Sequence, residues 1–240
     1  MKKYRVADVI YADTSAAFDR LSHGILLGKL YLECGVHGNA WKILKAWTTK
    51  RRQFVSWNGE SSEEVDVTSS CMQGSSLGTT LWNVYFNEVC VCLEKWIEEL
   101  EIEGCTSFVY ADDVKIVYVL TPENVWKINV LLQRLQVKMD ELHLKFNALK
   151  CHVLTLGSIR NMRYDVIMKN EEGNDEVLVR TMVERDLGVQ VDSDGSFETQ
   201  IKKCNSTAKA TAKIMSRIFR KCDFITKVQL YESHIFSRMS

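Results

Sequence analysis

Residues 108–118 read FVYADDVKIVY. The runs FVY and VKIVY are rich in β-branched and aromatic side chains, which favour strands, and ADD between them is typical of a turn. We therefore expect a hairpin that carries Asp112 and Asp113 in its turn. A second apolar run, VADVIYA at residues 6–12, suits a buried strand that ends at Asp13. In a mixed sheet these two places can be neighbours, which would gather the carboxylates at one edge.

Helical periodicity and turn signals divide the rest of the chain. Capping residues and apolar spacing predict a helix that follows Ser22 and closes at Gly35, and further helices over residues 39–50, 77–103, 122–142 and 199–220. Strands are expected on either side of Asn58-Gly59, at residues 153–156, and in one ribbon made of residues 164–169 and 177–191. This order of strands and helices, without an internal repeat, favours an α+β layer fold.

Composition describes an ordinary globular protein. The chain has 240 residues, of which 46% are hydrophobic and 26% are charged. It lacks an apolar run long enough to span a membrane, and its first residues lack the pattern of a signal peptide. Eight scattered cysteines without a CxxC pair are typical of reduced thiols. We therefore expect no membrane partner and a nuclear or cytoplasmic location.

The charges cancel in total but are unevenly distributed. The 31 basic and 31 acidic side chains balance, yet residues 1–60 carry 10 basic and 5 acidic groups and residues 198–240 carry 9 and 3. Residues 61–140 are acidic, with 5 basic and 13 acidic groups. Basic ends could grip a phosphate polymer while an acidic centre holds metal ions, but such segregation also occurs on solvated surfaces.

Carboxylates that follow two different strands suit phosphoryl-transfer chemistry. Two Mg²⁺ ions held by oxygen ligands about 3.5–4 Å apart can activate a hydroxyl and stabilise the charged transition state. An aspartate pair in a turn is also a common solvated turn, and an aspartate after a strand is also a common helix cap. The carboxylates alone leave both interpretations open.

Five ordered motifs reduce that ambiguity. They read YADTSAAFD at residues 11–19, SSCMQGSSLGTTLWNVYFNEV at 69–89, FVYADD at 108–113, LKFNALKCHVLTLG at 144–157 and VERDLGVQVDSD at 183–194. In order and spacing they resemble the palm motifs of reverse transcriptases, and more narrowly those of non-LTR, LINE- or jockey-type retrotransposons. The resemblance implies a split βαβ, ferredoxin-like palm sheet with helices on one face, followed by the start of a helical thumb.

The resemblance also implies a domain plan. Residues 1–160 would form the palm, with a residual fingers segment at about residues 20–68. Residues 161–197 would form a ribbon like a primer grip, and residues 198–240 the basic helical start of a thumb. Family members have a larger fingers region before the first aspartate, so we expect an N-terminally truncated chain. Its missing fingers and endonuclease regions would either lie in another chain or have been lost.

Roles for single residues follow from the same resemblance. Asp13 and Asp112, with Asp113 beside them, would be the catalytic residues and the ligands of two Mg²⁺ ions, for which Mn²⁺ could substitute. The residues implied in binding the dNTP, the RNA template or the DNA primer are Phe18, Gln73, Gly74, Tyr110, Lys150, Leu187 and Gly188.

Several of these residues have specific expected roles. Phe18 matches the aromatic position that excludes a 2′-hydroxyl, and Gln73-Gly74 matches the loop that approaches template and nucleotide. Lys150 matches a lysine near the triphosphate, and Leu187-Gly188 matches the hairpin that steadies the primer terminus. A core phenylalanine and a surface lysine would look the same as Phe18 and Lys150 in the sequence alone.

The chain departs from the family pattern at three places. Met72 and Thr79 stand where the family usually has proline, and Ala16 stands where it usually has lysine. None of these changes removes an expected metal ligand. The sequence therefore predicts an RNA-directed DNA polymerase domain that transfers a nucleotide from a dNTP to a primer 3′-hydroxyl. The alternatives are an inactive, truncated remnant that at most binds nucleic acid, and an unrelated protein whose acidic turns are structural.

Overall fold

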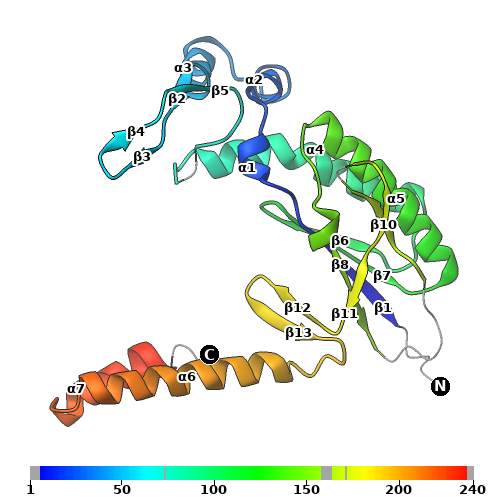
Figure 1. The fold of residues 1–240 in the computed structure, drawn as a ribbon. Coiled ribbons are helices and arrows are strands. Elements are labelled where there is room, and N and C mark those ends of the chain that lie inside the picture. Colours follow the sequence, from blue (N-terminus) through cyan, green and yellow to red (C-terminus); the bar gives the residue numbers. More distant parts are fainter. Residues whose placement is uncertain (1–5, 73, 158–163, 171, 237–240) are drawn as a thin grey trace. The chain divides into compact units, whose positions relative to one another are not determined.

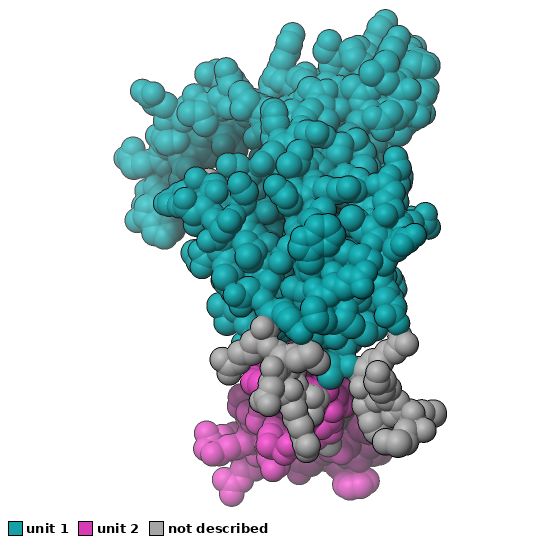
Figure 2. All heavy atoms as spheres, turned by 90° about the vertical axis from the view of Figure 1, so that its right-hand side faces the viewer, with its two compact units in different colours: residues 1–153, 160–180 teal, residues 154–159, 181–240 magenta. Residues whose placement is uncertain are grey.

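The computed structural model describes residues 6–72, 74–157, 164–170 and 172–236. The chain divides into two compact units, which Figure 2 distinguishes by colour. Unit 1 comprises residues 1–153 and 160–180, and unit 2 comprises residues 154–159 and 181–240. In the part of the chain described, no helix is both long and apolar enough to cross a membrane.

A five-stranded sheet is central to the fold. Its strands lie in the order β11-β8-β1-β7-β6 (Figure 1). They are β1 (Ala7–Ala12), β6 (Thr106–Tyr110), β7 (Asp113–Val119), β8 (His152–Leu156) and β11 (Val179–Thr181). Both β1 and β6 pair with β7 in the antiparallel sense. The expected α+β class, with the strand at residues 6–12 and the hairpin at 108–118, is confirmed.

The pairing of β1 with β7 determines which side chains face the core. Ile10 lies opposite Ile116, and Ala12 lies opposite Val114. Directly opposed residues share one face of a sheet, and all four of these side chains are buried. Helices α4 (Gly78–Glu99) and α5 (Pro122–Glu141) cover this face (Figure 1). The helix predicted over residues 77–103 ends at Glu99, four residues early. The acidic segment that follows Glu99 turns back toward β6.

The capping signal at Thr121 and the turn signal at Asn58-Gly59 are confirmed, whereas Ser22 precedes its helix without a side-chain cap hydrogen bond. Thr121 is the N-cap of α5 and its side chain accepts a hydrogen bond from the Asn124 amide. Asn58-Gly59 has positive φ angles of 50° and 85°, as a two-residue hairpin turn requires. Between β1 and α4 lie α1 (Ala17–Arg20), α2 (His23–Leu32), α3 (Gly38–Thr48), β2 (Arg51–Gln53), β3 (Ser56–Trp57), β4 (Glu60–Ser61) and β5 (Val65–Val67).

The prediction of one ribbon made of residues 164–169 and 177–191 is wrong. The structure has a hairpin of β9 (Ile167–Lys169) and β10 (Asp175–Val177), then β11 in the central sheet, and then a second hairpin in unit 2. The first hairpin is fixed to α5 by two side-chain amides. Asn129 bonds the backbone of Ile167 and Asp165, and Gln136 bonds both the N–H and the carbonyl of Lys169. These long-range bonds have no local sequence signal.

Unit 2 consists of the second hairpin and helices. Its elements are β12 (Val183–Asp186), β13 (Val189–Asp192), α6 (Glu198–Ile218), α7 (Phe224–Leu230) and the π-helix η2 (Tyr231–Ile235). The buried Asp192 carboxylate accepts hydrogen bonds from the amide and the hydroxyl of Thr199 in the first turn of α6. A carboxylate at a helix N-terminus satisfies free N–H groups, so Asp192 anchors the basic helix to its hairpin.

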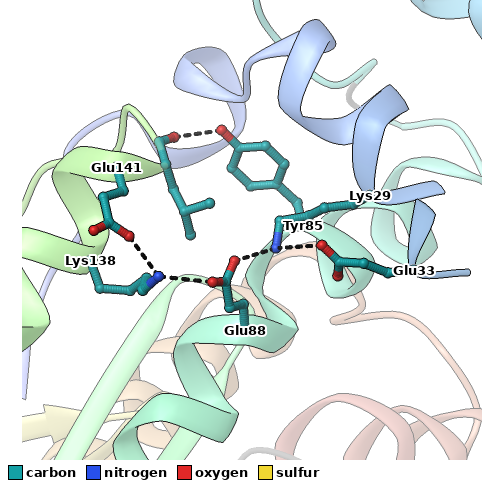
Figure 3. Close-up of polar contacts among 7 residues, drawn as sticks. Lys29, Glu33, Tyr85, Glu88, Lys138 and Glu141 are labelled. Atoms are coloured by element: carbon teal, nitrogen blue, oxygen red, sulfur yellow. Dashed lines mark hydrogen bonds and ion pairs between the residues drawn. The ribbon is translucent and has the colours of Figure 1, made fainter. Parts of the chain in front are cut away.

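A polar network joins the three helices α2, α4 and α5 (Figure 3). Glu88 on α4 accepts from Lys29 on α2 at 2.6 Å and from Lys138 on α5 at 2.8 Å. Lys29 is only 5% exposed, and its charge is paired closely with this carboxylate and more distantly with Glu33, at 3.9 Å. The hydroxyl of the buried Tyr85 adds a second link, since it accepts from the Ser22 amide and donates to the Leu142 carbonyl.

The two lysines change the acidity of Glu88. Hydrogen bonds from Lys138 and Lys29 lower the pKa of Glu88 below its ordinary value of 4.5. A carboxyl whose pKa is lower in the folded state stabilises the fold above its unfolded pKa and loses that contribution as the pH falls. The network should therefore weaken in mild acid.

We expect Glu88→Gln to lower the free energy of unfolding by about 1–2 kcal/mol, because Lys29 would keep its buried charge with only the more distant carboxylate of Glu33, at 3.9 Å. Urea unfolding at pH 7 measures the effect. Glu98→Gln on the exposed side of the same helix is the matched control and should change stability by less than about 0.5 kcal/mol. Equal effects of the two substitutions would contradict this role.

The pH dependence gives a second prediction. The stability difference between the wild type and Glu88→Gln should be full at pH 6 and should shrink as the pH falls below the ordinary pKa of 4.5 and through the lowered pKa of the folded state. Urea unfolding at several pH values measures this difference. A difference that stays constant down to pH 3 would show that the charge of Glu88 is not responsible.

Candidate polymerase active site

The hairpin of β6 and β7 presents its acidic residues at one end of the sheet. Tyr110 pairs with Asp113, so the turn itself consists of Ala111 and Asp112. Asp113 is thus the first residue of β7 and not part of the turn, because its backbone joins the ladder. Ala111 has a φ of 55°, a left-handed conformation that is costly for alanine. Asp112 is half-buried and Asp113 is exposed.

Asp13 lies at the same end of the sheet as this turn. It follows Ala12, which pairs with Val114 at the start of β7. The buried Thr14 then donates its hydroxyl to the Asp112 carbonyl at 3.0 Å. The β1–β7 register and this bond bring together Asp13 and Asp112, which are 99 residues apart in the chain.

The segment before β8 forms a second support for Asp13. The Asn147 amide donates to the Asp13 carbonyl at 2.9 Å, and the buried Cys151 thiol lies 3.9 Å from the same oxygen. Burial raises the pKa of Cys151 to about 12, so the thiol stays neutral. The Lys150 ammonium lies 3.8 Å from the Asp13 carboxylate on an exposed surface. Lys150 thus places a positive charge beside the Asp13 carboxylate.

Phe18 lies in the short helix α1, five residues after Asp13 in the sequence. Its ring is half-buried and packs against the ring of Trp82 on α4, with the two ring centroids 4.7 Å apart. The Phe18 carbonyl accepts the Cys71 amide, which fixes the segment before α4 against α1. The structure therefore places Phe18 in the same neighbourhood as the hairpin turn, because Trp82 also contacts that turn.

The loop between Cys71 and Gly78 is closed at its base. The Cys71 thiol donates to the Gly78 carbonyl, and a Cβ on Gly78 would lie only 2.8 Å from the Met72 carbonyl oxygen. Gly74 at the exposed part of the loop has a φ of 79°, which explains why glycine suits it. Gln73 lies outside the described residues.

Three other expected contact residues lie in two separate hairpins. Tyr110 is 67% exposed, on the face of the β6–β7 hairpin opposite the buried one. Leu187 and Gly188 form the two-residue turn between β12 and β13, with φ angles of 46° and 95°. Both φ angles are positive, as a type I′ turn requires. This turn belongs to unit 2, whereas the residues around Asp13 belong to unit 1.

The chemistry of the donor set fits a magnesium ion. Asp13 and Asp112 offer carboxylate oxygens, and the nearby Cys151 is a neutral thiol. Within the described ranges, no group of three or more His, Cys, Asp or Glu side chains is arranged to hold a metal. Mg²⁺ is commonly bound through one or two carboxylates together with waters and substrate phosphates, so two aspartates suit it.

Sequence reasoning missed three residues that shape this site. Thr14, Trp82 and Cys151 contact the backbone of Asp112, Ala111 and Asp13, respectively. Thr14 and Trp82 lie inside the quoted motifs, but a motif does not tell which backbone atom a side chain contacts. These roles depend on pairs that are 29 to 138 residues apart.

We expect Thr14→Val to lower stability by about 1 kcal/mol, because the Asp112 carbonyl would lose its hydrogen-bond donor while the side-chain volume stays similar. Urea unfolding measures this loss, and hydrogen exchange of residues 108–118 should become faster. Thr14→Ser keeps the hydroxyl and should retain most of the protection of the turn. Faster exchange in both variants to the same extent would argue against the hydroxyl.

The chain is similar to a known protein family and to solved structures. The family model described as reverse transcriptase (RNA-dependent DNA polymerase) matches residues 2–179. No curated protein matches significantly. Apo telomerase from Candida tropicalis is similar with 12% identity and a TM-score of 0.52, over 80% of this chain and 32% of that one. Telomerase from Candida albicans, in complex with a TWJ fragment of telomeric RNA, has 11% identity and a TM-score of 0.51, over 85% and 34%.

The structural matches cover only part of each telomerase chain. The chain spans about a third of the length of the telomerase structures. At 11–12% identity the likeness concerns the fold alone.

Proposed function

The chain belongs to the reverse transcriptase family, and from this we propose that it acts as the RNA-directed DNA polymerase domain of a non-LTR, LINE- or jockey-type retroelement. The proposed reaction joins a DNA primer 3′-hydroxyl to the α-phosphate of a dNTP and releases pyrophosphate, with RNA as the template. The observation that carries the proposal is the approach of Asp13 and Asp112, supported by the bond from Thr14 to the Asp112 carbonyl. The non-LTR assignment depends on the five sequence motifs.

The two aspartates would act as ligands of divalent cations. Asp13 and Asp112 would hold two Mg²⁺ ions, with Asp113 beside them, and Mn²⁺ could replace Mg²⁺. The ions would lower the pKa of the attacking hydroxyl and stabilise the transition-state charge. Lys150, with its ammonium 3.8 Å from Asp13, would attract the triphosphate and offset the charge of the carboxylates before the nucleotide binds.

Other residues would position the substrates. Phe18 would pack under the sugar and exclude a 2′-hydroxyl, and the loop with Gln73 and Gly74 would approach the template. Tyr110, as the exposed residue before the turn, would contact the primer strand. The turn at Leu187-Gly188 would steady the primer terminus.

We also propose the domain plan implied by the motifs. Residues 1–160 would be the palm, including a fingers remnant at about residues 20–68. Residues 161–197 would act as a primer grip. The basic helix in residues 198–240 would run along duplex phosphates, because its lysines and arginines suit a salt-dependent backbone contact.

Primer extension on an RNA template with dNTPs and Mg²⁺ tests this function. We expect Asp13→Asn and Asp112→Asn to lower incorporation at least 100-fold, because each removes a metal-binding charge, while primer-template binding by fluorescence anisotropy stays within about threefold. Asp140→Asn, at an exposed position on α5, is the matched control and should retain wild-type activity.

Two outcomes would contradict the proposal in different ways. A folded wild-type chain that binds primer-template in a salt-dependent manner, but does not extend it, would leave nucleic-acid binding as the function. Equal losses in Asp112→Asn and Asp140→Asn would show that the decline is not specific to the carboxylates at this end of the sheet.

A further inference from the structure

Trp82 contacts both functional parts of the proposed site from inside the core. The side chain is 1% exposed on α4. Its indole N–H donates to the Ala111 carbonyl at 2.9 Å. The same ring lies 4.7 Å from the ring of Phe18, at a tilt of 34°. One rigid side chain therefore links the turn that carries Asp112 to the aromatic residue expected beneath the sugar.

The bond to Ala111 holds a strained piece of backbone. Ala111 has a φ of 55°, and a non-glycine residue in this region costs of order 1–3 kcal/mol unless its surroundings fix it. The Thr14 hydroxyl holds the next carbonyl, that of Asp112. Two successive carbonyls of the turn thus accept hydrogen bonds from side chains. The Ala111 carbonyl accepts from Trp82 in the core, and the Asp112 carbonyl accepts from Thr14, the residue after Asp13. Loss of the indole N–H would free the strained residue to relax, and Asp112 would move with it.

The ring of Trp82 cannot easily yield to Phe18. It is stacked on Phe86, with ring centroids 5.3 Å apart and an interplanar angle of 18°. Tyr85, which is fully buried, lies at 6.3 Å on the same side of α4. Close-packed interiors have no room for a ring to shift without a cost. Phe18 therefore packs on a fixed surface on its core side.

We infer that Trp82 is a positioning residue that acts on two groups at once, through its N–H on the Ala111–Asp112 turn and through its ring on Phe18. The inference rests on the proposed polymerase function for its meaning, but each contact can be measured without catalysis. The N–H contact sets the affinity of the carboxylates for a divalent cation. The ring contact sets the discrimination between dNTP and NTP.

Two variants separate the N–H from the ring. Replacement of Trp82 by β-(3-benzothienyl)alanine keeps the size and shape of the ring but exchanges the N–H for sulfur. Trp82→Leu removes both the N–H and the ring. Leu93→Ala is the matched control, because it removes a buried apolar side chain from α4 eleven residues along the helix from Trp82. The isostere preserves volume, so the test does not depend on the folding of the leucine variant.

Binding of Mn²⁺, followed by the EPR signal of the free ion, tests the turn. The isostere should weaken Mn²⁺ binding about fivefold, the change expected when one hydrogen bond of about 1 kcal/mol is lost, and should speed hydrogen exchange in residues 108–118. Leu93→Ala should change both by less than twofold. Wild-type Mn²⁺ affinity and exchange in the isostere would refute the N–H role.

A fluorine label on the Phe18 ring tests the other contact. Its ¹⁹F resonance should shift or broaden in Trp82→Leu but stay near the wild-type position in the isostere and in Leu93→Ala. In primer extension, Trp82→Leu should lower the preference for dNTP over NTP, measured as a ratio of kcat/KM, at least fivefold, whereas the isostere should keep the ratio. An unchanged ¹⁹F signal or an unchanged ratio in Trp82→Leu would refute the ring role.

Failure of the proposed function would give a different pattern. If the wild type extends no primer, the Mn²⁺, hydrogen-exchange and ¹⁹F measurements still decide whether Trp82 holds the turn and Phe18. If the wild type extends primers but the control Leu93→Ala reproduces every effect of Trp82→Leu, then Trp82 has only a general packing role.

Discussion

The antiparallel register of β1 against β7 is the constraint from which the rest of the site follows. Ala12 lies opposite Val114, so the residue after β1 and the turn before β7 meet at one end of the sheet. A shift of β1 by one residue would turn Ile10 away from the core and from Ile116, and would move Asp13 away from Asp112. The burial of these apolar side chains therefore stabilises the fold and aligns the carboxylates at the same time.

Buried polar contacts fix the elements around this pair of strands. Asp8 in β1 is fully buried and accepts from Arg180 and from the Tyr118 hydroxyl. Burial, together with the negative charge of Asp8, raises the pKa of Tyr118, so the phenol remains a donor. Among the helices, Glu88 on α4 binds one lysine from α2 and one from α5. Removal of one partner from either group would leave a charge with little access to water.

The proposed site consists of supports for the backbone as well as functional side chains. Thr14 holds the Asp112 carbonyl, Trp82 holds the Ala111 carbonyl, and Asn147 holds the Asp13 carbonyl. Such supports limit the motion of the two carboxylates, and a metal site needs ligands held close to their working geometry. Phe18 shares Trp82 with the turn, so sugar discrimination and metal affinity are expected to respond to the same indole.

The residues alone determined the local elements, the α+β class and the family. Thr121 before Pro122, Asn58-Gly59, and the alternating apolar residues of β7 act over a few positions, so their signals can be read along the chain. The ribbon over residues 164–191 was wrong because the bonds of Asn129 and Gln136 to β9 come from a distant helix. The motifs identified the candidate aspartates, but their approach depends on strand register and on the Thr14 bond. Likewise, only packing across 29 residues gives Trp82 its contact with Ala111, because a buried hydrogen bond requires both partners to be placed by the whole core.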